Sequence, residues 1–84
     1  MNYFMIHISE IATHYILLRE SLEKLRDARR DKTGAVLGYV SQHYIAAEGA
    51  KNFLSSAPDY IKEKLGIREL EMELNQFGNV ILRL

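Results

Sequence analysis

The sequence predicts an all-α or predominantly α fold, a small antiparallel bundle of three to four helices. From Ser9 to Arg30 the apolar residues recur alternately four and three positions apart, the spacing of an amphipathic helix. The next segment, Thr33 to Ser56, carries only two fully charged residues and reads as a helix with more than one neighbour. The connections at 31–34 and 55–58 are short, which favours antiparallel neighbours.

The first helix is predicted from Ser9, whose hydroxyl suits an N-cap, to about Asp31. Glu10 adds a negative charge in the first turn, and cations collect toward the other end, as the helix dipole favours. Its apolar seam consists of Ile11, Tyr15, Leu18, Leu22 and Leu25.

The second helix offers little polar surface to water. Its apolar positions form two neighbouring seams, one of them Val36, Val40, His43, Ala47 and Leu54. An apolar surface this wide exceeds what one helix contact requires, so we expect the second helix to be the centre of the core. A short third helix is then predicted to begin near Pro58, which is suited to a helix start, and to stop at Gly66.

The tail from Ile67 to Leu84 fits two structures. Apolar residues at 67, 70, 74, 77, 81 and 84 repeat with helical spacing, which favours a helix. The alternation of Leu, Met and Glu before Gly78 and Asn79 is also typical of a β-hairpin. In either case we expect Gly78 with Asn79 to end the first element. Short terminal strands, residues 2–8 paired with residues 80–84, complete the alternatives.

The composition of the chain excludes several classes of function. The 84 residues form one predicted helical domain, residues 1–84, and the formal charge of zero excludes a histone-like polybasic protein. The absence of cysteine excludes disulfides, thiolate zinc sites and a thiol nucleophile. The N-terminus lacks the pattern of a signal peptide, and no apolar run is long enough to span a bilayer, so we expect a small cytoplasmic protein without a membrane partner.

No catalytic constellation is visible in the sequence. Glu10 and His14 share a helix face and His43 could approach them, but two ligands do not make a metal site. No serine lies in a nucleophile elbow, and no glycine-rich loop precedes a Lys-Ser or Lys-Thr pair. We therefore expect no enzyme activity, no catalytic residue, no metal and no cofactor.

The sequence instead favours a non-enzymatic protein-interaction module: a small regulator, inhibitor or assembly factor acting through an apolar helical surface. A homodimer is predicted, together with a protein partner that the sequence does not identify. The candidate contact residues are Tyr39, Tyr44 and Ile45, because exposed aromatic clusters are typical of interface hot spots. The apolar terminal residues are added candidates.

A nucleic-acid-binding regulator is the alternative. Its candidate residues are Arg26, Arg29, Arg30 and Lys32, the one local cluster of positive charge. Interspersed Asp and Glu residues largely neutralise this face, which makes nucleic acid the less favoured partner.

Overall fold

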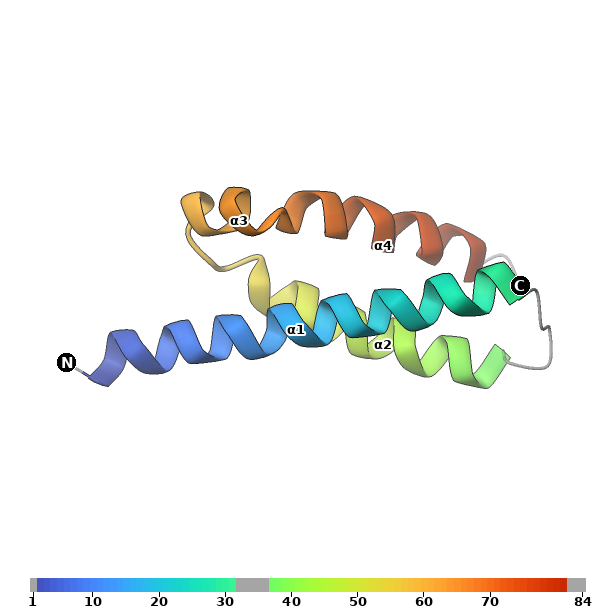
Figure 1. Ribbon diagram of the computed structural model, residues 1–84, viewed down its shortest axis with the longest axis horizontal. Helices are drawn as coiled ribbons and strands as arrows, with labels where there is room; N and C mark the ends of the chain where they lie inside the picture. The colour runs from blue at the N-terminus through green and yellow to red at the C-terminus, as the bar shows by residue number, and fades with distance from the viewer. Residues whose placement is uncertain (1, 32–36, 82–84) are drawn as a thin grey trace.

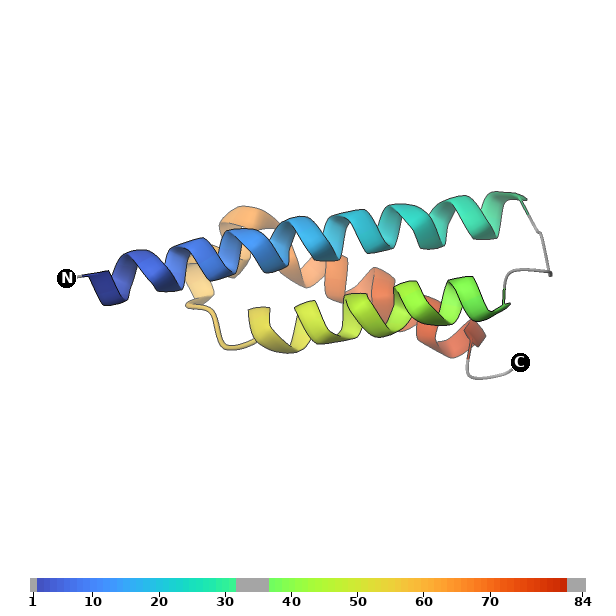
Figure 2. The same ribbon diagram turned by 90° about the horizontal axis from the view of Figure 1, so that it is seen from below.

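The computed structural model describes residues 2–31 and 37–81, with side chains over 8–29 and 42–79. These residues form four helices: α1 (Asn2–Asp31), α2 (Leu37–Leu54), α3 (Asp59–Leu65) and α4 (Ile67–Ile81). Figure 1 shows α1 running along the whole molecule, α2 returning beside it, and α3 and α4 lying over one face. Figure 2, turned by 90°, shows α1 and α2 side by side with α3 and α4 behind them. The predicted small helical bundle is therefore confirmed.

The core lies where α1, α2 and α4 meet. Leu18, Leu22 and Leu25 on α1 are almost completely buried, as the spacing of the apolar residues predicts. Both α1 and α2 contact α4, so the expectation that α2 has more than one neighbour is confirmed. The other buried apolar residues are Ile11, Ala47, Ala50, Leu54, Ala57, Ile67, Leu74 and Phe77.

The first helix begins earlier than the sequence indicated. We predicted an N-cap at Ser9, but α1 starts at Asn2 and Ser9 lies inside it, with its carbonyl oxygen accepting a 2.9 Å bond from Thr13 Oγ1. Residues 2–8 contain neither Gly nor Pro, so nothing stops the helix from extending toward the N-terminus. The predicted end at Asp31 is confirmed.

The terminal strands are therefore wrong for the residues that the structure describes. Residues 2–8 belong to α1 and residues 80–81 to α4, while residues 82–84 lie outside the described range. A helix satisfies its backbone groups internally, whereas a two-stranded ribbon is marginal without further support.

Gly66 separates α3 from α4, as the sequence predicted. It adopts a left-handed conformation (φ 67°, ψ 31°), which glycine tolerates without a steric penalty. Its N–H bonds to the carbonyls that end α3, and α4 begins at the next residue. Pro58 occupies the N-cap of α3, one position before the first helical residue.

The tail is helical, so the hairpin alternative is wrong for residues 67–81. The prediction that Gly78 and Asn79 would end the helix is also wrong, because α4 continues through both to Ile81. The structure gives Gly78 a packing role instead. A Cβ atom on it would lie 2.5 Å from Tyr44 Oη and 3.1 Å from Tyr44 Cζ, so α4 approaches α2 closely at this point.

We predict that Gly78→Ala destabilises the fold by about 1–2 kcal/mol, because overpacking at Tyr44 outweighs the gain in helix propensity. Gly49→Ala is the matched control: its added Cβ meets nothing within 4 Å, so we expect a gain of about 0.5–1 kcal/mol. Urea denaturation measures both. In a Tyr44→Phe background, which removes the hydroxyl, the cost of Gly78→Ala should fall; an unchanged cost would contradict the close contact.

Candidate protein-interaction surface

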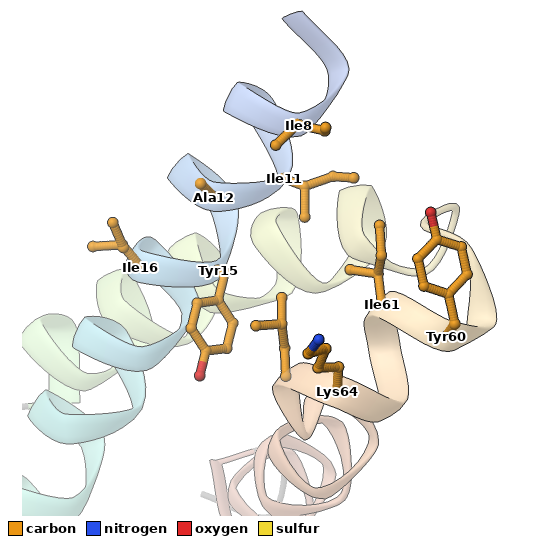
Figure 3. A pocket seen from close by; sticks show the side chains of 9 residues that line it. Ile8, Ile11, Ala12, Tyr15, Ile16, Tyr60, Ile61 and Lys64 are labelled. Atoms are coloured by element: carbon orange, nitrogen blue, oxygen red, sulfur yellow. The ribbon is translucent and has the colours of Figure 1, made fainter. Parts of the chain in front are cut away.

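An open groove lies between the first half of α1 and the short helix α3. Its volume is about 520 Å³, within the range of ligand and partner sites in proteins. Figure 3 shows Ile8, Ala12 and Ile16 along α1, with Tyr60, Ile61 and Lys64 on α3 across the gap. We call it the α1/α3 groove, and its lining consists of Ile8, Ile11, Ala12, Tyr15, Ile16, Tyr60, Ile61, Lys64 and Leu65.

The spacing of residues on α1 explains why two kinds of apolar side chain occur there. Ile11 and Leu18 face the core and are buried. Ile8, Ala12 and Ile16 are four residues apart and form a second row beside the core seam. This second row, the Ile8–Ile16 stripe, forms the outer wall of the groove.

The walls of the groove are exposed to solvent. Ile8 is 47% exposed, Ile16 is 54% exposed and Tyr60 is 64% exposed. Single exposed apolar residues are ordinary, but three large ones around one concave apolar site are typical of an interaction surface.

The lining of the groove carries little charge. Lys64 is the single charged residue of the lining, and the Arg19 guanidinium carbon lies 5.6 Å from the centre of the Tyr15 ring. Beyond Ile16 the surface becomes polar, where a smaller depression is lined by Arg19, Glu20, Glu23 and Arg26. The apolar part of this face therefore ends at Ile16.

The residues predicted to contact a protein partner are not gathered at this groove. Ile45 on α2 is 69% exposed. Tyr44 is half-buried against the core and donates a 2.9 Å hydrogen bond to Glu48 Oε1, while burial raises its pKa. The backbone of Tyr39 lies in α2, but its side chain is outside the described part of the structure. These contacts stay a prediction.

Two residues of the predicted basic face contact α4. Arg26 donates two hydrogen bonds to the Glu73 carboxylate, at 2.5 Å from Nε and 2.6 Å from Nη2. The Arg29 guanidinium carbon lies 5.5 Å from the centre of the Phe77 ring. The side chain of Arg30 and the whole of Lys32 lie outside the described part. Arg26 and Arg29 thus already have partners within the chain.

The histidine considered as a metal ligand is used in packing. The His14 ring stacks on Phe53, with centroids 3.9 Å apart and an interplanar angle of 11°. His14 Nδ1 lies 2.7 Å from the backbone carbonyl of Glu10, to which it donates when that nitrogen carries the proton. Within residues 2–31 and 37–81 no group of three potential ligands is placed to hold a metal ion.

Searches against protein families, curated proteins and solved structures found no match to this chain. Among the described helices, none combines the length and apolar character needed to cross a membrane.

Sequence reasoning missed the α1/α3 groove. The sequence did contain a signal for the α1 wall of the groove, because Ile8, Ala12 and Ile16 repeat every four residues beside the core seam. Because the helix was expected to start at Ser9, Ile8 was placed outside it, and the repeat of Ile8, Ala12 and Ile16 was not recognised. The other wall depends on how α3 lies against α1, which local spacing does not show.

The Arg26–Glu73 pair gives a pH-dependent prediction. The hydrogen bonds from Arg26 hold the pKa of Glu73 below its usual value, so the pair stabilises the fold above the ordinary carboxyl pKa and loses that contribution as pH falls through the lowered one. We expect Glu73→Gln to cost about 0.5–1 kcal/mol at pH 7, since Arg26 is half exposed.

The difference between wild type and Glu73→Gln should shrink toward pH 3. Chemical denaturation at the two pH values measures it. Glu63→Gln is the control, because Glu63 is exposed on α3 and its replacement should have little effect at either pH. An equal cost at pH 7 and pH 3 for Glu73→Gln would contradict this role of the pair.

Proposed function

We propose that the protein is a non-enzymatic interaction module, a small regulator, inhibitor or assembly factor, that acts as a homodimer through an apolar helical surface. The α1/α3 groove is the observation that carries the proposal. Eight of its nine lining residues are apolar or aromatic, which is the composition that binds another apolar surface. We assign the dimer contact to this groove rather than to the α2 patch considered from the sequence, which consists of Tyr39, Tyr44 and Ile45.

The energetics favour a protein partner at this groove. Burying apolar surface contributes about 25 cal/mol per Å², and a helix presenting apolar side chains would cover Ile8, Ile16 and Tyr60 together. Lys64 and the tyrosine hydroxyls are the polar groups of the lining, and they remain able to contact water or polar groups of a partner.

The nucleic-acid alternative receives less support. It depends on a basic face of which Arg26 already bonds to Glu73 and Arg29 already lies over Phe77. Phosphate binding would have to compete with these contacts. Protein interaction therefore remains our proposal.

The test compares the oligomeric state of wild type with that of two matched variants, Ile16→Glu on α1 and Ile45→Glu on α2. Sedimentation equilibrium at micromolar to millimolar concentration should give wild type a mass of about twice 9.7 kDa. Ile16→Glu places a charge in the groove wall. It should raise the dimer dissociation constant at least about 10-fold, because association would remove water from the new carboxylate. Ile16 and Ile45 are both exposed, so the helix content of each variant, measured by circular dichroism, should equal that of wild type.

Ile45→Glu is the control, since Ile45 is also exposed but lies on α2. We expect it to leave the dimer intact. Dissociation by Ile45→Glu, with Ile16→Glu still dimeric, would transfer the interaction to the α2 patch. A wild-type monomer throughout the concentration range would contradict the homodimer.

A further inference from the structure

The Ile8–Ile16 stripe is symmetric about a small residue. Ala12 is exposed, and an isoleucine stands four residues before it and four residues after it on the same face of α1. Between Ile8 and Ile16 this face carries no charged side chain: its other residues near the stripe are Ser9, Thr13 and Tyr15. Such a row is one ridge of the kind that packs into the groove of another helix.

We infer that the occupant of the α1/α3 groove is α1 of a second copy, which crosses the first α1 in antiparallel orientation at Ala12. The two-fold axis passes through this crossing point, so Ile8 of each chain meets Ile16 of the other. The inference rests on the proposed function and specifies the partner of that same groove.

The surface area of the chain supports a second copy as the occupant. The accessible surface is 6087 Å², about 1000 Å² more than is typical of a monomer of this mass. A standard interface removes about 800 Å² from each partner. The excess is thus the size of one side of a stable dimer interface.

Ala12 permits the close approach that such a crossing needs. A methyl side chain lets two helix axes come to the short end of the usual 8–10 Å separation. The isoleucines on either side then fill the space on both sides of the contact. Two identical chains satisfy this arrangement with one patch each, as a two-fold interface requires.

Charge decides the direction of the crossing. Beyond Ile16 the four-residue row continues with Glu20, and Arg19 and Glu23 lie beside it. In a parallel pair, each would lie opposite its own copy, so like charges would face one another. In an antiparallel pair centred on Ala12, Arg19 lies opposite residue 5 of the second copy, a methionine, and like charges do not meet. Opposed helix dipoles favour the same direction.

The geometry sets distances that single cysteines can report. Axes about 8–10 Å apart, with Cα atoms about 2.3 Å from each axis, place the two Ala12 Cα atoms about 3.5–5.5 Å apart. Disulfides span Cα separations of about 4.4–6.8 Å, so a bond between the two positions is possible. For a crossing near 50°, position 8 lies about 6–7 Å from position 16 of the second copy but about 11–12 Å from its own copy.

Disulfide cross-linking is the experiment, and the absence of native cysteine makes single-cysteine variants clean probes. Under mild oxidation at concentrations where wild type is dimeric, Ala12→Cys should form a disulfide-linked dimer about 100-fold faster than Ile45→Cys, the exposed control on α2. Mixing Ile8→Cys with Ile16→Cys chains of different mass should give mainly the mixed dimer. Sedimentation under reducing conditions checks that each variant still associates.

Three results would overturn the inference. If wild type is a dimer but Ala12→Cys cross-links no faster than Ile45→Cys, the dimer contact does not lie at Ala12. That result would contradict this inference and leave the proposed function standing. Preferred self-cross-linking of Ile8→Cys over the mixed pair would show a parallel crossing. A wild-type monomer would remove both the proposed function and the inference.

Discussion

The structure depends on a mismatch in length between its first two helices. At 1.5 Å per residue, the 30 residues of α1 extend about 45 Å, whereas the 18 residues of α2 extend about 27 Å. α2 therefore covers only part of α1. The long dimension of the molecule, 48 Å, is essentially the length of α1. The part of α1 that α2 leaves uncovered is its N-terminal end.

The remaining helices meet this constraint in two different ways. α4 lies beside the second half of α1, where Leu74 and Phe77 complete the buried core and Glu73 binds Arg26. α3 has only seven residues and no fully buried side chain, so it lies against the first half of α1 without closing over it. The α1/α3 groove is the direct result of this short helix, and Gly66 allows the chain to turn from α3 into α4.

The sequence predicted the core better than the surface because the two depend on different information. Leu18, Leu22 and Leu74 are buried as their spacing indicated, since helical periodicity alone places side chains on one face. Gly78 shows the limit of such reasoning. Its intrinsic preference favours a helix end, yet the helix continues through it, and Tyr44 on α2 occupies the space where a side chain would stand. Only the tertiary contact gives the reason for this glycine.

The candidate site was harder to predict for the same reason. From the sequence, Tyr44 was expected to contact a partner from an exposed helix face, but its ring packs at the core and its hydroxyl donates a hydrogen bond to Glu48. Ile8 looked like part of a terminal strand, but it lies on a helix and forms a wall of the groove. Whether an apolar residue is exposed depends on which neighbouring helix reaches it, and the helix lengths decide that.

Association and folding are therefore expected to be linked in this protein. The N-terminal end of α1 extends past α2, and a helix that packs on one side only is marginal in water. A partner that buries the Ile8–Ile16 stripe would supply apolar contact that α3 leaves unmade, and it would bind the ordered helix in preference to the unfolded chain. Binding of this kind adds to the free energy of unfolding and makes it depend on protein concentration. If the proposed association occurs, the residues that the short α3 leaves exposed are the residues through which the chain gains stability.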